Sequence, residues 1–125
     1  MPQPIAVLAV DDDPNMHRLI QLYLKQENFL VTTVSSGRMA LHKLDLDEYD
    51  LVISDIQMPQ MDGITLVREI RNRKNTVPVI ILSAFGTHSQ AKEALDAGAN
   101  SVLEKPFEQE QLIKKIKQQL NGKNK

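Results

Sequence analysis

Five short apolar runs, separated by longer stretches of mixed character, constrain the fold of this chain more than any other feature. Runs of this length, rich in β-branched and aliphatic residues, are typical of buried strands. They are Ile5–Val10, Phe29–Val34, Leu51–Ser54, Val77–Leu82 and Ser101–Glu104. Because a stretch of helical length follows each run, the pattern predicts an α/β fold in which helices cover both faces of a parallel sheet.

The stretches between the runs carry apolar residues three and four positions apart, which is the spacing of one helix face. Three such faces are Met16, Leu19, Ile20 and Tyr23 in the first helix, Ala91, Ala94 and Leu95 in the fourth, and Leu112, Ile113, Ile116 and Leu120 in the last. Asp13 followed by Pro14 predicts a helix start, because the carboxylate can cap and proline fits the first turn. Gly98 marks the expected end of the fourth helix.

Polar residues follow four of the predicted strands. Asp11-Asp12-Asp13 follows the first run, Asp55 the third, Ser83 the fourth and Lys105 the fifth. In a doubly wound sheet, the ligand site lies outside the carboxyl ends of the strands, where the strand order reverses. Clustered carboxylates call for a divalent cation, and a hydroxyl and an ammonium beside them suggest a bound phosphoryl group. The sequence therefore predicts a metal and phosphoryl site at this edge.

The composition bounds the domain organisation and the class of partner. A chain of 125 residues with a net charge of −1 and no cysteine forms one domain without disulfides or thiol chemistry. Charges of both signs are mixed along the chain, and no apolar stretch approaches membrane-spanning length. We therefore expect a cytoplasmic location, no direct nucleic-acid binding and no membrane partner. The expected domain covers 4–121, followed over 122–125 by a disordered tail or the start of a linker.

Six motifs, taken together, resemble those of a known family. Each is common alone, but their order and spacing are specific. They are Val10-Asp11-Asp12-Asp13, Ser54-Asp55-Ile56-Gln57-Met58-Pro59, Met61-Asp62-Gly63, Ser83-Ala84, Ala97-Gly98-Ala99 and Lys105-Pro106-Phe107. Over essentially its full length, the chain resembles a response-regulator receiver domain of two-component signalling, of the chemotaxis-receiver type. The resemblance implies a flavodoxin-like (βα)5 fold, a doubly wound sheet of five parallel strands in the order 2-1-3-4-5.

The resemblance also implies a set of metal ligands. Asp55 is the expected phosphoacceptor, and Asp11, Asp12, Asp55 and the backbone carbonyl of Gln57 are the expected ligands of Mg²⁺, for which Mn²⁺ can substitute. Magnesium suits a site with few carboxylates that keeps some of its waters. The charge of the site also fits this ion. The charges of Asp11, Asp12, Asp55 and Lys105 sum to −2, which one Mg²⁺ cancels.

Four further residues complete the site that the resemblance implies. Ser83 and Lys105 are the expected catalytic contacts of the phosphoryl oxygens, with Ala84 and Pro106 beside them in the cofactor-binding site. The lysine ammonium stabilises negative charge that spreads in the transition state. The peptide before Pro106 is expected to be cis, as X-Pro peptides can be at a sharp turn.

The implied function is a phosphorylated signalling switch. A carboxylate can attack phosphorus and form an acyl phosphate, so Asp55 takes the phosphoryl group from a phospho-histidine donor. The expected donor is a sensor histidine kinase or a histidine phosphotransfer protein, and the expected reader is a downstream protein or a fused output domain. The chain is then no true enzyme, because it catalyses only its own phosphorylation and dephosphorylation.

Other hypotheses compete with this one. A pseudo-receiver would bind partners without phosphorylation, although the full set of ligands and Lys105 argue against it. A phosphohydrolase with an aspartyl-phosphate intermediate usually needs a second carboxylate two residues after the nucleophile, and Gln57 occupies that position. A flavin-binding module of the same fold is disfavoured, because acidic residues instead of a phosphate-binding loop follow the first strand.

Several polar residues have structural interpretations. Asp13 and Asp62 are expected to act as a helix cap and as a cap or turn residue. His17, His42 and His88 show no spacing typical of a metal site, so we interpret them as structural or surface residues.

Two positions depart from the pattern of the family. The residue three before Lys105 is usually Tyr or Phe, and here it is Val102. An acidic pair is common in the subfamily that dimerises through helix four, strand five and helix five, and here Asn100-Ser101 replaces it. Both differences predict that phosphorylation is only weakly coupled to self-association.

Overall fold

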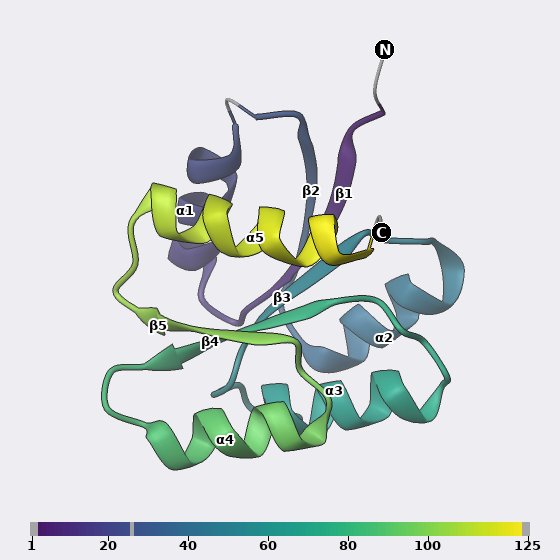
Figure 1. Ribbon diagram of the computed structural model, residues 1–125. Coiled ribbons are helices and arrows are strands. Elements are labelled where there is room, and N and C mark those ends of the chain that lie inside the picture. Colours follow the sequence, from purple (N-terminus) through teal and green to yellow (C-terminus); the bar gives the residue numbers. More distant parts are fainter. Residues whose placement is uncertain (1–2, 26, 124–125) are drawn as a thin grey trace.

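The computed structural model describes residues 3–25 and 27–123, which form alternating strands and helices (Figure 1). The strands are β1 (Ile5–Val10), β2 (Phe29–Val34), β3 (Leu51–Asp55), β4 (Val79–Ala84) and β5 (Ser101–Lys105). The helices are α1 (Pro14–Leu24), α2 (Gly37–Leu46), α3 (Gly63–Asn72), α4 (His88–Ala97) and α5 (Gln109–Lys123). The predicted alternation of strand and helix is confirmed throughout the described residues.

The described strands form one parallel sheet in the order β2-β1-β3-β4-β5, which confirms the predicted fold class and strand order. Helices α1 and α5 cover one face of the sheet, and α2, α3 and α4 cover the other (Figure 1). The order reverses between β1 and β3, and the chain leaves these two strands toward opposite faces. The carboxyl ends of these two strands therefore lie where a doubly wound sheet has its ligand site.

Alternating side chains along the central strands divide the core into two layers. Leu8 and Val10 of β1 pack in the layer that contains α2, α3 and α4, whereas Val7 and Ala9 pack with α1 and α5. Burying a large aliphatic side chain contributes about 1.5–3 kcal/mol, so a strand covered on both faces is strongly held. The central strands thus form a firm support for the residues at their carboxyl ends.

Three strands extend further toward their carboxyl ends than the sequence indicates. The last residues of β3, β4 and β5 are Asp55, Ala84 and Lys105, which we expected to lie in the loops that follow. Ala84 pairs with Lys105 in the sheet. The predicted site residues Asp55 and Lys105 are therefore held by sheet pairing, with less freedom than loop residues would have.

The start of β4 and the end of α5 also differ from the prediction. β4 begins at Val79 instead of Val77, because Pro78 has no N–H and the Val77 N–H donates to Asn75 Oδ1 at 3.0 Å. α5 runs to Lys123, past the residue where a tail was expected to begin, and residues 124–125 of that tail lie outside the described part of the chain.

The helix signals are confirmed, with one correction. Asp13 Oδ1 accepts a hydrogen bond from Asn15 N at 2.9 Å and caps α1, and Gly98 ends α4 with a φ of +121°. Leu95, however, is 47% exposed, although we expected it to share the core face of α4 with Ala94. Ala94 is fully buried, and each further residue turns about 100° around the helix, so Leu95 points away from the core.

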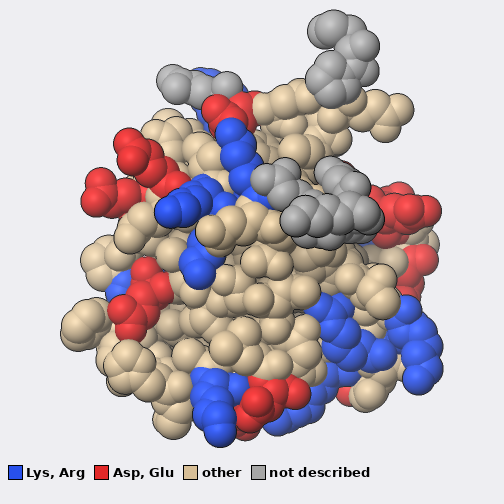
Figure 2. Space-filling model, viewed as in Figure 1, with Lys and Arg blue, Asp and Glu red and all other residues tan. Residues whose placement is uncertain are grey.

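Basic and acidic side chains are interspersed on the face seen in Figure 2, where neither sign forms one continuous field. Four of the described ion pairs join exposed or half-exposed groups, among them Arg68 with Glu93 at 3.5 Å. Among the described residues, no helix has both the length and the apolar character needed to cross a membrane.

Candidate functional site

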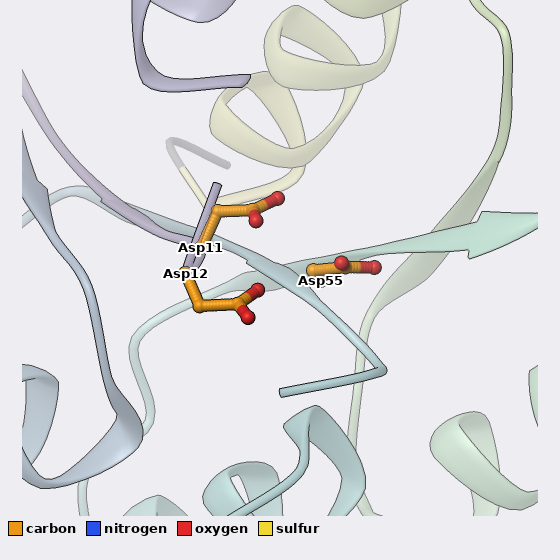
Figure 3. A group of neighbouring side chains, drawn as sticks. All are labelled: Asp11, Asp12 and Asp55. Atoms are coloured by element: carbon orange, nitrogen blue, oxygen red, sulfur yellow. The ribbon is translucent and has the colours of Figure 1, made fainter. Parts of the chain in front are cut away.

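Parallel strands bring three carboxylates to one edge of the sheet (Figure 3). Asp11 and Asp12 follow β1 directly, and Asp55 ends β3, the neighbouring strand. One oxygen from each carboxylate lies within 4.8 Å of the other two. Asp11 and Asp55 are only 2% and 8% exposed, whereas Asp12 is exposed. These three residues, called the acidic cluster below, are brought together as the sequence predicts.

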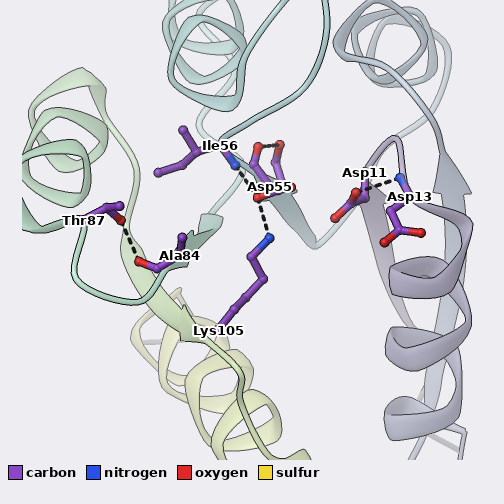
Figure 4. Close-up of polar contacts among 8 residues, drawn as sticks. Asp11, Asp13, Asp55, Ile56, Ala84, Thr87 and Lys105 are labelled. Atoms are coloured by element: carbon purple, nitrogen blue, oxygen red, sulfur yellow. Dashed lines mark hydrogen bonds and ion pairs between the residues drawn. The ribbon is translucent and has the colours of Figure 1, made fainter.

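Backbone N–H groups orient the two buried carboxylates (Figure 4). Asp13 N donates to Asp11 Oδ1 at 2.9 Å, and Ile56 N donates to Asp55 Oδ1 at 2.9 Å. The buried hydroxyl of Ser54 donates to the backbone oxygen of Asp55 at 2.9 Å. Both carboxylates therefore have a defined direction that does not depend on a ligand.

Lys105 reaches the acidic cluster from β5 (Figure 4). Its Nζ lies 3.0 Å from Asp55 Oδ1, in an ion pair between partly buried groups. The peptide between Lys105 and Pro106 is cis, as expected from the family resemblance. An ammonium beside the buried carboxylate partly balances the negative charge of the cluster.

Burial raises the pKa of the Asp11 carboxyl from its ordinary 3.8 to about 6, because the charged form loses its hydration. The negative charges of Asp55 and Asp12 raise this pKa further, while the Asp13 N–H and the Lys105 ammonium lower it. The Asp13 N–H and the Lys105 ammonium therefore do not offset the loss of hydration and the like charges at Asp11. Carboxylate oxygens are ligands that hard divalent cations prefer, so the residues present fit such an ion.

The other predicted site residues lie around the cluster at different depths. Ser83 is 2% exposed and is the last but one residue of β4, beside β3. Ala84 is exposed, and its carbonyl accepts a hydrogen bond from Thr87 Oγ1 at 2.7 Å (Figure 4). Gln57 and Pro106 are both exposed. The sheet thus carries Ser83 to the edge that holds the acidic cluster, while Gln57 and Pro106 lie at the solvent boundary.

Gly63 packs directly against the end of β3 at Asp55. Its N–H donates to Ile56 O at 2.7 Å, and a Cβ at this position would overlap with the backbone oxygen of Asp55. The preceding residue, Asp62, caps α3 by accepting a hydrogen bond from Thr65 N at 2.7 Å, which confirms its predicted role as a cap. The start of α3 therefore supports the end of β3 at very close range.

His17 contacts the site in a way that sequence reasoning missed. Its Nε2 lies 2.6 Å from the backbone oxygen of Asp11 and 3.1 Å from that of Val34. Its interpretation as a structural residue agrees with these contacts, and His42 and His88 are exposed. The one available signal was its place, a single helical turn after the cap of the helix that follows the acidic residues.

A profile of the family described as "Response regulator receiver domain" matches residues 7–117. This chain belongs to the response regulator receiver family. Receiver domains of this kind act in two-component signalling, and the acidic cluster has the position and composition typical of phosphoacceptor regulators.

Curated relatives of this receiver domain are longer proteins. The transcriptional regulatory protein GlrR of Escherichia coli is 40% identical over 114 residues, which is 91% of this chain and 26% of the relative. The transcriptional regulatory protein ResD of Bacillus subtilis is 34% identical over 111 residues, covering 89% of this chain and 46% of that protein. The chain therefore spans about a quarter to a half of the length of these relatives.

Solved structures of similar size share the fold of this receiver domain. The chemotaxis response regulator CheY4 of Vibrio cholerae has a TM-score of 0.88 and 31% identity, covering 94% of this chain and all of that one (100%). A putative response regulator from Chloroflexus aurantiacus has a TM-score of 0.91 and 33% identity, covering 95% and 99% of the two chains.

Proposed function

We propose that this receiver domain accepts a phosphoryl group on Asp55 from a phospho-histidine donor, with Mg²⁺ bound, and thereby switches a partner-binding surface. The observation that carries the proposal is the distance of 3.0 Å between Asp55 Oδ1 and Lys105 Nζ beside the other two carboxylates of the acidic cluster. A carboxylate that is held next to both an ammonium and a cation-binding cluster is suited to attack an anionic phosphoryl donor.

The contacts of Asp55 distinguish its two oxygens. The hydrogen bonds from Ile56 N and Lys105 Nζ both end on Oδ1, so we assign the attack to Oδ2. A bond forms between Oδ2 and phosphorus as the bond from phosphorus to the donor's histidine nitrogen breaks, and that nitrogen keeps the electron pair. Lys105 stabilises the negative charge that spreads over the phosphoryl oxygens during this step.

The remaining roles follow the same arrangement. When bound, a divalent cation lowers the repulsion between the anionic donor and the carboxylates. Asp11, Asp12, Asp55 and the backbone carbonyl of Gln57 would hold it, and the buried hydroxyl of Ser83 would donate to a phosphoryl oxygen. The N–H of Ala84 and the turn at Pro106 would border the phosphoryl group. The acyl phosphate then carries new charge at the end of β3, which reorganises the loop after Ser83.

The expected donor is a histidine kinase or a histidine phosphotransfer protein, as membership of a two-component family suggests. A groove beside the site supports such a partner, because its lining is mainly apolar and includes Lys105 of the site. Its lining includes Met16, Leu19, Phe85, Lys105 and Phe107. The reader of the phosphorylated state is a downstream protein or a fused output domain, and the curated relatives are named as transcriptional regulators.

Intact mass spectrometry after incubation with acetyl phosphate tests the assignment of the phosphoacceptor. We expect one added phosphoryl group on the native chain with Mg²⁺, none with EDTA, and none on Asp55→Asn. Asp62→Asn is the matched control, because Asp62 is an exposed cap whose acceptor oxygen the amide retains. It should label like the native chain.

Equal labelling of Asp55→Asn and the native chain would contradict the role of Asp55. A native chain that stays unlabelled with acetyl phosphate and with several phospho-histidine donors would favour the pseudo-receiver hypothesis instead. Sustained release of phosphate from an added monoester would favour the hydrolase, although the side-chain amide of Gln57 cannot act as a base.

A further inference from the structure

The peptide group between Asp11 and Asp12 departs from strand geometry. In a strand, successive side chains point to opposite faces of the sheet. The carboxylates of Asp11 and Asp12 instead approach each other within 4.8 Å, and Figure 3 shows both pointing toward Asp55. β1 ends at Val10, and the backbone bends at Asp12, directly after the peptide that these two acidic residues share. Whatever holds this peptide also sets the spacing of the two carboxylates.

The oxygen of this peptide contacts His17, on the first turn of α1. Nε2 of His17 lies 2.6 Å from Asp11 O and 3.1 Å from Val34 O. Both partners are carbonyl oxygens, which can only accept, so Nε2 carries the hydrogen and donates in both contacts. Because a peptide group is planar, a fixed oxygen also fixes the direction in which the chain continues to the Cα of Asp12.

A backbone contact holds the same turn from its other side. Asp11 N donates to Val34 O at 3.1 Å, so this carbonyl accepts from the Asp11 backbone and from His17. The half-buried imidazole therefore joins the carboxyl ends of β1 and β2. As a result, both the N–H and the C=O of Asp11 are anchored by groups outside the acidic cluster.

We propose that His17 is a positioning residue for the metal site: its Nε2–H holds the Asp11–Asp12 peptide so that both carboxylates face Asp55 before a cation binds. This inference rests on the proposed function, because its consequence is the affinity for Mg²⁺. Removing an outer contact that orients a metal ligand typically weakens metal affinity by about 10–100-fold.

Two amide substitutions of His17 test whether the position of the hydrogen-bond donor matters, because both amides are polar donors but only one reaches as far as Nε2. The side-chain amide of Gln places its nitrogen about as far from the backbone as Nε2 of histidine, whereas that of Asn ends nearer, at the level of Nδ1. By calorimetric titration of Mg²⁺ at fixed pH, we expect His17→Gln to bind within about threefold of the native Kd and His17→Asn at least about tenfold more weakly. His42→Asn, an exposed site on α2, should bind like the native chain.

Two further measurements guard against a merely structural effect. Melting in EDTA reports on the fold without metal, and His17→Met, whose side chain has no donor, replaces His17→Asn if that variant is unfolded. Hydrogen exchange in EDTA should be faster at the Asp12 and Asp13 amides of His17→Asn than of His17→Gln, because the turn is no longer held.

The outcomes distinguish this inference from the function on which it rests. Equal Mg²⁺ affinity of folded His17→Asn and His17→Gln would overturn the role of His17, while native binding would leave the metal site intact. A native chain that binds no Mg²⁺ would instead overturn the metal site. In that case hydrogen exchange still tests the positioning role of His17, because equal exchange rates in His17→Asn and His17→Gln would reject it.

Discussion

The edge of the sheet formed by the amino ends of the strands and the edge formed by their carboxyl ends use polar side chains in opposite ways. They are called the amino edge and the carboxyl edge below. At the amino edge, carboxylate and amide oxygens complete the hydrogen bonding of the backbone. Asp50 Oδ2 accepts from Ala6 N, and Asn100 Oδ1 accepts from Val79 N, both at 2.8 Å. At the carboxyl edge, the three carboxylates of the acidic cluster face one another, and one has a pKa raised to about 6. One edge satisfies its polar groups, and the other concentrates like charge.

Arg71 shows the amino-edge arrangement most clearly. Its guanidinium donates to the carbonyls of Gly98, Asn75 and Val77 and to Asn100 Oδ1, at distances between 2.8 and 3.1 Å. Burial lowers the pKa of this arginine, yet the hydrogen bonds match its charge and join the end of α3 to the α4–β5 connection. The difference between the edges teaches that stability and chemistry are separated in this domain, so removing a charged side chain should have opposite effects on stability at the two edges.

The largest effect is expected from packing at the carboxyl edge. Gly63→Ala should destabilise the fold by more than about 3 kcal/mol, because the added Cβ collides with the backbone oxygen of Asp55. Urea unfolding measures this loss. Gly86→Ala is the control, since its Cβ would have open space and only the φ of +83° is unfavourable, at about 1 kcal/mol. Similar losses of stability in both variants would show that the backbone conformation of the glycine, and not the collision of the Cβ, causes the destabilisation.

Removing charge from the acidic cluster should stabilise the metal-free fold. The pKa of Asp11 is about 6 in the folded chain and 3.8 in its ordinary state, so the folded chain holds the proton more tightly. Stability of the native chain in EDTA should therefore fall as the pH rises from about 4 to about 6 and then level off. Asp11→Asn lacks this loss and should be more stable by about 3 kcal/mol at pH 8, since one pKa unit is about 1.4 kcal/mol.

Urea unfolding between pH 4 and pH 8 checks this prediction, and added Mg²⁺ should stabilise the native chain more than Asp11→Asn. Asp13→Asn serves as the control, because Asp13 is an exposed cap whose acceptor oxygen the amide keeps. A native chain whose stability does not decline over this range would show that Asp11 is not under electrostatic strain.

At the amino edge, removing a charged side chain should lower the stability of the fold instead of raising it. Phosphorylation should be retained. Arg71→Met leaves several backbone carbonyls without their donor and should cost about 2 kcal/mol of stability. Labelling by acetyl phosphate should stay native in the folded variant. Arg68→Met removes only a half-exposed pair with Glu93 and should cost less than about 0.5 kcal/mol. Loss of labelling in folded Arg71→Met would show that the two edges are coupled.

The smallest effect is expected at the face of α4 and β5, between the two edges. Val102 is too small to fill the space left when the loop after Ser83 moves, so a phosphoryl mimic should change self-association little. We expect beryllofluoride with Mg²⁺ to alter the dimerisation constant by less than about tenfold, or about 1.4 kcal/mol. Sedimentation measures it, with Val102→Tyr as the variant expected to couple more strongly. Full conversion of the native chain to a dimer would contradict the inference.

Most of the fold could be predicted from the sequence, because its signals are local. The alternation of buried strands and helices, the cap at Asp13 and the end of α4 at Gly98 depend on near neighbours in the chain. The start of β4 was placed too early, since the apolar character of Val77 outweighed the missing N–H of Pro78. Leu95 was wrongly assigned to the core because helix periodicity does not show how wide the buried face is.

The acidic cluster could also be predicted, because strand ends in a parallel sheet meet at one edge and because the motifs resemble those of a family. The supporting residues could not. In the sequence, Arg71 is typical of a solvated residue in the last turn of a helix. Its partner Gly98 is 27 residues away. His17 and Val34 are 17 residues apart, and only the pairing of β1 with β2 brings them together. Such contacts depend on the assembled sheet, and local patterns do not contain them.

The pairing of β1 with β3 has a consequence for the lifetime of the protein in a cell. This pairing, for example of Val7 with Leu51, brings Asp11 and Asp12 beside Asp55. Without it, the unfolded chain has no metal site. A cation therefore stabilises only the folded form, by about 1.4 kcal/mol at ten times its dissociation constant. Proteases degrade opened chains, and their rate follows the population of those chains when opening is fast. The cellular concentration of the divalent cation that binds here would then influence how quickly this domain is degraded, apart from any signal that it carries.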